Sequence, residues 1–138
     1  MPDDQPWHLG GFQSNGGTNI VITHNNIVCD HAQNSLGEGC TGDLNLIPDF
    51  AVVSNVTVDH NYFGANIDAS YCTYGGEKST SPYPHADHVV YTNNVFQRGT
   101  NQMCGAFGPV TGFDVNGAGN QWTNNTWEDD STAVPPEN

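Results

Sequence analysis

The chain has 138 residues and a formal charge of −13, because 15 acidic residues outnumber the two basic ones, Lys78 and Arg98. This excess excludes nucleic acid as a partner, since binding to phosphates requires a basic surface. The sequence contains no apolar stretch long enough to cross a bilayer, so no membrane insertion is predicted. The length suits a single domain that spans residues 1–138.

A repeated phrase centred on asparagine runs along the chain, at residues 19–27, 55–63, 88–96 and 119–127. Its steps of 36, 33 and 31 residues fall in the range of periods typical of solenoids. The shared asparagines are Asn25, Asn61, Asn94 and Asn125. The apolar residues three positions earlier are Ile22, Val58, Tyr91 and Trp122. The apolar residues two positions after the asparagines are Ile27, Phe63, Phe96 and Trp127.

Within the phrases, apolar and polar residues alternate as in a strand. Val56 and Val58 flank Thr57, and a period of two with β-branched residues is typical of β-structure. The asparagine then interrupts the strand, because asparagine tolerates the left-handed backbone that a sharp corner requires. Its side chain can bond to the equivalent asparagine of the next coil. The sequence therefore predicts an all-β protein, a right-handed parallel β-helix of about four coils with an asparagine ladder along one corner.

A second column is predicted from aromatic residues. Phe50 and Tyr83 each precede a ladder asparagine by 11 residues, and Phe12 and Phe113 lie in similar glycine-rich segments. Because the coils of a solenoid place equivalent positions above one another, we expect these four side chains to stack in another sheet.

The four cysteines, Cys29, Cys40, Cys72 and Cys104, allow three pairings. Cys29 and Cys40 lie in one loop after the first phrase, whereas Cys72 and Cys104 are 32 residues apart, about one coil. The coil arrangement therefore predicts the bridges Cys29–Cys40 and Cys72–Cys104. Disulfides indicate an oxidising compartment, so we expect a secreted, extracellular protein. A zinc site is disfavoured because the chain has no Cys-x-x-Cys pair.

Residues 104–114 and 119–130 resemble the closing coil of secreted right-handed β-helix repeat proteins of the pectate-lyase-like superfamily, of the type common in actinobacteria. Many members carry a His-x-Asp-Gly-x-Gln phrase, which here runs from His8 to Gln13 with Gly10 in place of the acid. Such proteins usually have several more coils, so the resemblance implies a minimal or N-terminally truncated version. It also implies a polysaccharide as the partner and leaves the reaction open.

Enzymatic activity stays an open question, with a polysaccharide hydrolase or lyase as the two candidates. The acidic charge disfavours a lyase, whose polyuronate substrate is repelled unless calcium bridges the two. A hydrolase requires two carboxyl groups roughly 5–10 Å apart, and strands of stacked coils lie about 4.8 Å apart. The acids considered are Asp49, Asp87 and Asp114, with His85 on the same face as Asp87. The alternative is that these acids cap turns.

Three tyrosines in or near loops, Tyr71, Tyr74 and Tyr83, are candidates for stacking on sugar rings. His24 and His60 hold the same phrase position and are expected to stack on neighbouring coils. A polar column explains them more simply than a metal does, so no metal site is predicted. No cofactor is predicted either, although the acidic run 128–130 leaves calcium open.

Two functions therefore remain. The first is a secreted protein that binds or modifies a polysaccharide or glycan surface. The second is a non-catalytic structural or adhesive solenoid, such as a cell-surface or phage tail component. The unpaired strand edges of the N-terminal coil also predict self-association through residues 7–12, because an exposed strand edge pairs with another chain.

Overall fold

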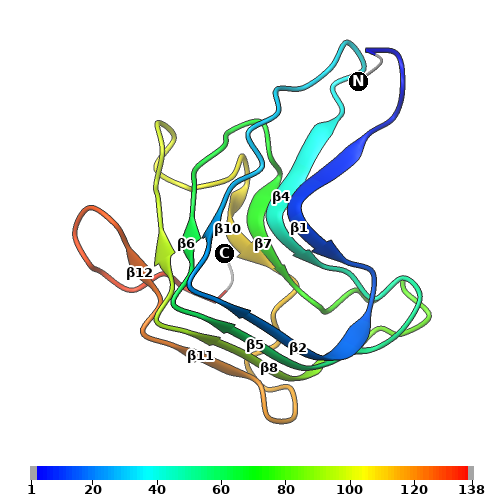
Figure 1. Cartoon of the computed structure of the whole chain (residues 1–138), viewed down its shortest axis with the longest axis vertical. Coiled ribbons are helices and arrows are strands. Elements are labelled where there is room, and N and C mark those ends of the chain that lie inside the picture. Colours follow the sequence, from blue (N-terminus) through cyan, green and yellow to red (C-terminus); the bar gives the residue numbers. More distant parts are fainter. Residues whose placement is uncertain (1–2, 137–138) are drawn as a thin grey trace.

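The computed structural model describes residues 3–136, which form twelve strands and no helix. The strands make three four-stranded parallel sheets that wrap into a solenoid of about four coils (Figure 1). Sheet A contains β1 (His8–Ser14), β4 (Gly39–Leu46), β7 (Tyr71–Gly75) and β10 (Gly108–Thr111). Sheet B contains β2 (Gly17–Thr23), β5 (Val53–Asp59), β8 (Asp87–Thr92) and β11 (Gln121–Thr123). Sheet C contains β3 (Asn26–Ile27), β6 (Tyr62–Phe63), β9 (Val95–Phe96) and β12 (Thr126–Trp127).

The predicted parallel β-solenoid is thus confirmed, and so is the register of its repeated phrase. Each phrase supplies one strand of sheet B and one of sheet C. Ile22 pairs with Val58, Val58 with Tyr91, and Tyr91 with Trp122. The first three are buried and Trp122 is half-buried, so this column faces the core as predicted.

Sheet C adds a second column to the core. Its members pair in register from coil to coil: Ile27, Phe63, Phe96 and Trp127. All four are buried, and the rings of Phe63 and Phe96 stack with centroids 4.7 Å apart. Burying each such side chain contributes roughly 1.5–3 kcal/mol, and a coil contributes only a few of them. The solenoid is therefore stable only as a stack of coils.

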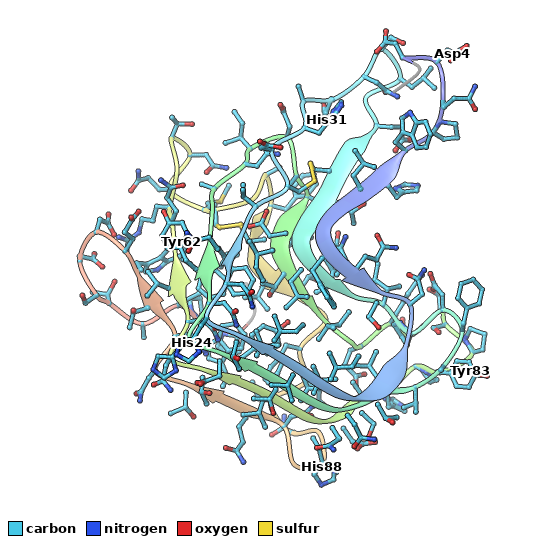
Figure 2. The ribbon with its side chains drawn as sticks, viewed as in Figure 1. Asp4, His24, His31, Tyr62, Tyr83 and His88 are labelled. Atoms are coloured by element: carbon cyan, nitrogen blue, oxygen red, sulfur yellow. A yellow bond between two sulfur atoms is a disulfide. The ribbon has the colours of Figure 1, made fainter. Side chains whose placement is uncertain are left out.

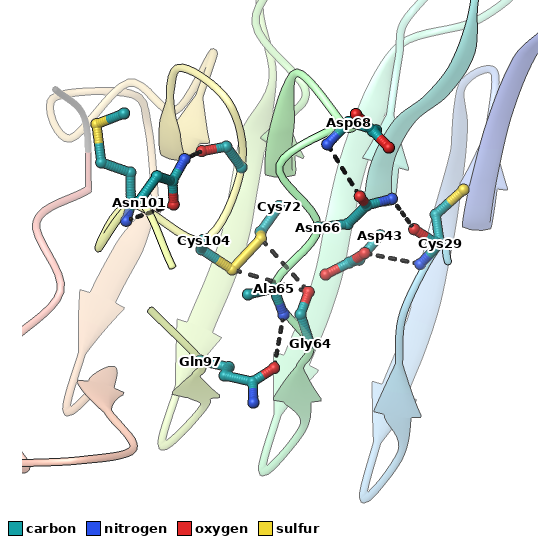
Figure 3. The surroundings of a disulfide bond; sticks show 12 residues. Cys29, Asp43, Gly64, Ala65, Asn66, Asp68, Cys72, Gln97, Asn101 and Cys104 are labelled. Atoms are coloured by element: carbon teal, nitrogen blue, oxygen red, sulfur yellow. Dashed lines mark hydrogen bonds between the residues drawn. A yellow bond between two sulfur atoms is a disulfide. The ribbon is translucent and has the colours of Figure 1, made fainter. Parts of the chain in front are cut away.

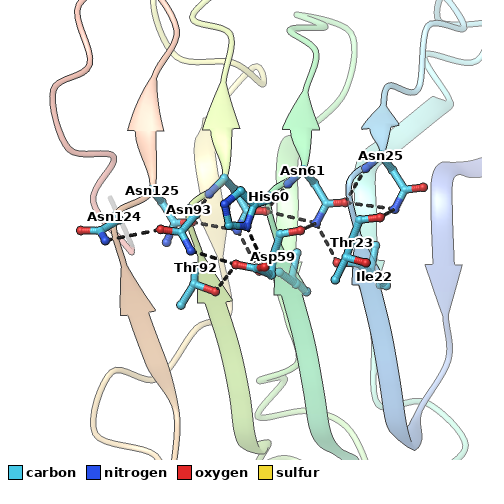
Figure 4. A network of polar contacts seen from close by, with 12 residues as sticks. Ile22, Thr23, Asn25, Asp59, His60, Asn61, Thr92, Asn93, Asn124 and Asn125 are labelled. Atoms are coloured by element: carbon cyan, nitrogen blue, oxygen red, sulfur yellow. Dashed lines mark hydrogen bonds and ion pairs between the residues drawn. The ribbon is translucent and has the colours of Figure 1, made fainter.

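The asparagine ladder is confirmed as well (Figure 4). Asn61 donates to Asn94 Oδ1 through its backbone N–H, at 2.9 Å, and through Nδ2, at 3.1 Å. Asn94 makes the same two bonds to Asn125, at 3.1 and 2.8 Å. The amide of Asn94 also donates to Val58 O, at 2.9 Å, in the preceding coil. Asn61 and Asn94 therefore satisfy their side-chain amides within the stack although they are buried.

One detail of the corner differs from the prediction. The left-handed residue is the one before the ladder asparagine, with φ of 58° at His24, 53° at His60, 56° at Asn93 and 54° at Asn124. This residue makes the corner, and the asparagine that follows turns its amide along the solenoid axis. The conformational freedom of asparagine is therefore used at two of the four corners, while the ladder position is selected for its amide.

Sheet A bends sharply, so its outer face is concave (Figure 1). The pairing of β1 with β4 shifts register between Leu9 and Gly10, as in a β-bulge. Asp43 and Leu44 are successive residues of β4 and both are buried on the core side, which breaks the alternation of a regular strand. A Cβ atom at Gly42 would lie 2.6 Å from Asn45 Oδ1, so glycine is required at the bend.

The predicted aromatic column is wrong. Phe113 is buried against Tyr91 and Trp122, whereas Phe50 is 78% exposed and Tyr83 is exposed in a turn. The turns that carry them differ in length, residues 47–52 after β4 and residues 76–86 after β7. Equal spacing to the ladder therefore does not place these rings above one another.

Both predicted disulfides are present, Cys29–Cys40 and Cys72–Cys104. Cys72 and Cys104 belong to the main core, and Figure 3 shows Asp43 and Gly64 beside their sulfurs. Cys29 and Cys40 form a smaller core with Ala69, against which Leu9 packs. In the part of the chain that the structure describes, no helix is long and apolar enough to span a membrane.

Candidate functional site

The concave outer face of sheet A holds a groove. Its larger part is a cavity of about 510 Å³ bordered by the turns 47–52 and 76–86, and a second cavity of about 260 Å³ adjoins it. Both are lined by His8, Thr41 and Tyr74, so they form one continuous depression, called the sheet A groove below. The larger volume falls within the range of roughly 300–1,000 Å³ that small-molecule sites occupy.

Tyr74 lies where the two cavities meet. Its ring meets the ring of Tyr71 edge-on, with centroids 5.7 Å apart, and Tyr71 lies 6.0 Å from Phe107. These contacts fix the orientation of the Tyr74 ring. Burial raises the pKa of Tyr74 above its usual value, so the phenol stays neutral and can donate a hydrogen bond. The groove therefore offers an oriented aromatic ring with a polar end.

Uncharged polar side chains surround this ring. Gln13, Tyr74 and Thr111 occupy one column of sheet A, because Gln13 and Tyr74 both pair with Asn45, and Thr111 pairs with Tyr74. Gln13 donates to Asn15 Oδ1 at 3.0 Å. Amide and hydroxyl groups can both donate and accept hydrogen bonds. The strand side of the groove therefore suits a ligand rich in hydroxyl groups.

The charged residues of the larger cavity lie on the two turns at its border, whereas Glu38 and Asp68 line the smaller cavity. Lys78 Nζ is 2.6 Å from Asp49 Oδ1, which joins the turn after β7 to the turn after β4. Glu77 accepts the backbone N–H of Ala86 at 2.6 Å through Oε1, and its Oε2 lies 3.2 Å from His85 Nδ1. The lysine that borders the groove is thus held by a carboxylate rather than left to bind an anion.

The four predicted catalytic residues do not come together. Asp49 lines the groove, whereas His85 lies beyond it, against Glu77. Asp114 caps the turn after β10, where its Oδ1 accepts the N–H of Asn116 at 2.8 Å. Asp87 lies on sheet B.

Asp87 lies at the start of β8, where its carboxylate is held by two neighbours. Asp87 Oδ1 accepts the hydroxyl of Ser54 at 2.6 Å and lies 2.8 Å from His88 Nδ1. These contacts, that of Ser54 first, hold the pKa of Asp87 below its usual value. Asp87 therefore links two coils of sheet B and is not one of the residues that line the groove.

Sequence reasoning missed Glu77, which lines the groove beside Lys78. The register of sheet A would have found it, because Leu46 pairs with Gly75 and both turns begin just after this pair. The strands of sheet A share no repeated phrase, so their register could not be inferred from the sequence. Of the three predicted tyrosines, the structure brings Tyr71 and Tyr74 together, while Tyr83 lies within the 76–86 turn (Figure 2).

Among the described residues, two clusters of metal-ligating residue types were weighed as metal sites. Asp43, Cys72 and Cys104 place one ligand atom each within 4.8 Å of one another. The two sulfurs are joined as a disulfide and offer no thiolate. His24 and His60 stack as predicted, with centroids 5.1 Å apart and planes 2° from parallel.

The surroundings of the second cluster and of the acidic run favour structural roles. His60 Nδ1 lies 2.7 Å from Asp59 Oδ2, so the histidine belongs to a polar network on the outer corner (Figure 4). In the run 128–130, Asp129 and Asp130 pair with Arg98, whose guanidinium lies 4.7 Å from the Trp127 ring centroid. These acids fasten the C-terminal loop to the solenoid.

Comparison with models of known protein families, with curated proteins and with solved structures gives no match to this chain. The geometry and chemistry of the sheet A groove are therefore the basis for inferring a function.

Proposed function

We propose that this chain is a secreted protein that binds a neutral polysaccharide in the sheet A groove. The observation that carries the proposal is the oriented ring of Tyr74 among uncharged hydrogen-bonding side chains. A sugar ring has an apolar face that packs on an aromatic ring, and hydroxyl groups at its edge that need donors and acceptors. The groove supplies both kinds of contact.

Charge favours a neutral ligand over an acidic one. The chain carries a formal charge of −13, which repels polyanions. Lys78, which borders the groove, is already paired with Asp49. A uronate carboxylate would have to compete with that contact.

The resemblance to the pectate-lyase-like superfamily supports the same ligand class, because it implies association with polysaccharides. The two disulfides support an extracellular location, where such ligands are found.

Hydrolysis of the bound polysaccharide is the second candidate. Asp49 and Glu77 both line the groove, and their surroundings differ. Asp49 faces the ammonium of Lys78, whereas Glu77 faces a backbone N–H and the ring of His85. Two carboxyl groups in different environments are what a glycosidase requires. The test is the release of reducing ends from a polysaccharide. Hydrolysis is favoured if this activity is lost in Glu77→Gln and retained in Glu128→Gln, because Glu128 lies outside the groove lining.

A glycan array that carries neutral and acidic polysaccharides tests the binding proposal, followed by calorimetry with the best neutral oligosaccharide. Tyr74→Ala should weaken binding by at least about tenfold, which corresponds to roughly 1.4 kcal/mol. Tyr62→Ala is the matched control, because Tyr62 is also half-buried but lies on sheet C, away from the groove (Figure 2). Absence of glycan binding would instead favour the structural solenoid, and equal losses in the two variants would contradict the sheet A groove as the binding site.

A further inference from the structure

The two ends of the solenoid differ. At the C-terminal end the last coil is covered by the segment that follows β12. Val134 is 2% exposed, its N–H donates to Asn125 O at 2.9 Å, and its carbonyl accepts Trp122 Nε1 at 2.8 Å. Ala133 forms an antiparallel bridge with Thr126. This segment closes the core and pairs with the edge of sheet C.

At the N-terminal end two inward positions of the first coil, Phe12 and Ile20, are partly exposed, although Ile22 and Ile27 are buried. Phe12 pairs with Leu44, yet Phe12 is 41% exposed whereas Leu44 is fully buried. Ile20 pairs with Val56 and is likewise only partly buried, whereas Val56 is fully buried. Leu44 and Val56 lie between two coils, whereas Phe12 and Ile20 have a neighbouring coil on one side only. This is why Phe12 and Ile20 are more exposed.

This end also contains a depression and three free strand edges. A cavity of about 430 Å³ lies between sheets A, B and C, with Phe12, Ile27 and Val28 among its eight lining residues. β1, β2 and β3 are the terminal strands of their sheets, so each has one edge without a strand partner among the described residues. An exposed strand edge with apolar surroundings is a template for pairing.

The described residues ahead of β1, 3–7, do not cover this end. Asp3 accepts the N–H of Ser35 at 3.0 Å, and the carbonyl of Gln5 accepts Asn34 Nδ2 at 2.6 Å. Leu9 packs against the Cys29–Cys40 disulfide. This arm therefore runs along the loop before β4 and leaves the mouth of the solenoid open.

The asparagine ladder is also open at this end. Asn25 donates to Asn61 through its backbone and side chain, as every later rung does to its successor. Asn25 Oδ1 occupies the position that accepts from the preceding rung in the other coils, and Asn25 itself is exposed. A polar group of this kind would be satisfied by a donor from an adjoining chain.

We propose that two copies of this chain associate head to head through the N-terminal coil, with β1, β2 and β3 at the interface. Head-to-tail stacking is less favourable, because at the other end Val134 covers the core and Ala133 pairs with β12, which leaves the edges of β10 and β11. Two identical open ends can close on each other about a twofold axis, which gives a dimer and no fibre. None of the eight residues that line the cavity is charged, so the repulsion between two acidic chains is weakest there.

The proposed interface uses strand edges and not the outer face of sheet A, so its test requires no glycan. Sedimentation velocity of the full chain from about 1 to 500 µM tests it, since a dimer without an extensive interface is expected to have a micromolar dissociation constant. We expect a monomer–dimer equilibrium that shifts toward the dimer at higher salt, because salt screens the repulsion between two acidic chains.

Val28→Lys should weaken the dimer at least about tenfold, because it places a charge at the cavity. Val115→Lys is the matched control, since Val115 is 54% exposed and Val28 is 46% exposed. Hydrogen exchange at low and high concentration should show added protection in residues 9–28 and none in residues 119–136. A monomer at all concentrations overturns the proposal and leaves another polypeptide's β-coil as the occupant. A dimer insensitive to Val28→Lys, or protected elsewhere, overturns it too.

Discussion

Asn61 Oδ1 accepts two hydrogen bonds from Asn25, one from the backbone N–H and one from Nδ2, both at 3.0 Å. The amide of Asn61 in turn donates to Ile22 O, at 2.8 Å, and to Asn94 Oδ1, at 3.1 Å. One buried side chain thus connects three successive coils, and the coils are held together by polar contacts as well as by the core.

Asn61→Ala should lower the free energy of unfolding by about 3 kcal/mol, because it leaves several buried donors and acceptors without partners. Urea denaturation measures the change. Asn25→Ala is the control, because Asn25 is exposed and its backbone N–H keeps its acceptor. We expect a loss of about 1 kcal/mol there. Equal losses at the two positions would contradict the role of burial in the ladder.

The repeated phrase made sheets B and C predictable, because each phrase forms one strand of each sheet. Ile22, Val58 and Tyr91 share both a phrase position and a place in the core. Only the left-handed residue was misplaced by one position, to Asn61 instead of His60. A pattern of residue types reveals which positions are equivalent, but it does not reveal which of two adjacent residues makes the corner.

Sheet A and its groove could not be predicted in the same way. Its strands share no phrase, because the bulge at Leu9 and the successive buried residues Asp43 and Leu44 disrupt the alternation from which a register is inferred. The turns that bring Asp49 to Lys78 differ in length, so their residues have no common spacing to the ladder. Tyr74 was identified from the sequence, whereas Glu77 required the register of the folded sheet.

Asp43 should make the protein less stable as the pH rises. Burial raises its pKa to about 8 from 3.8, against the opposing effect of the Cys29 N–H that donates to its Oδ1. Between these two values the folded state binds up to one proton more than the unfolded state. The contribution of Asp43 to the free energy of unfolding is therefore most favourable below about pH 4. It falls as the pH rises toward 8 and is constant above that.

Asp43→Asn tests this, because an amide does not ionise and Asn Oδ1 can still accept the N–H of Cys29. Thermal unfolding of both proteins between pH 5 and 8, measured about every half unit, should show a steeper loss in the parent chain. Repulsion among the other acids acts in both proteins and cancels in the comparison. Identical slopes would mean that Asp43 does not titrate in this range.

Asp59 should show the opposite behaviour. The hydroxyl of Thr92, at 2.6 Å, His60 Nδ1, at 2.7 Å, and Asn93 Nδ2, at 3.0 Å, hold the pKa of Asp59 well below its usual value. Its contribution to stability is therefore present above the unfolded pKa and lost as the pH falls through the folded one.

Carboxyl NMR titrations of Asp59 measure this shift directly. Thr92→Val should raise the pKa of Asp59, because it removes the first of the three donors. Thr57→Val, which changes a hydroxyl on the same strand as Asp59 without removing a donor to it, should leave the titration unchanged. An unchanged pKa in Thr92→Val would show that this hydroxyl does not hold the carboxylate in solution.

Val134 should stabilise the C-terminal end as a cap. Its side chain is 2% exposed in the main core, and its backbone bonds to Asn125 and Trp122. Val134→Ala removes two buried methyl groups and should cost about 2 kcal/mol in chemical denaturation. Val115→Ala, at a valine that is 54% exposed, should change stability by no more than about 0.5 kcal/mol. If the cap is dispensable, the two substitutions will have similar small effects, and residues 119–127 will keep their hydrogen-exchange protection in Val134→Ala. If the cap closes the core, hydrogen-exchange protection will fall first in the last coil, because the cap shields Trp122 and Trp127 from water.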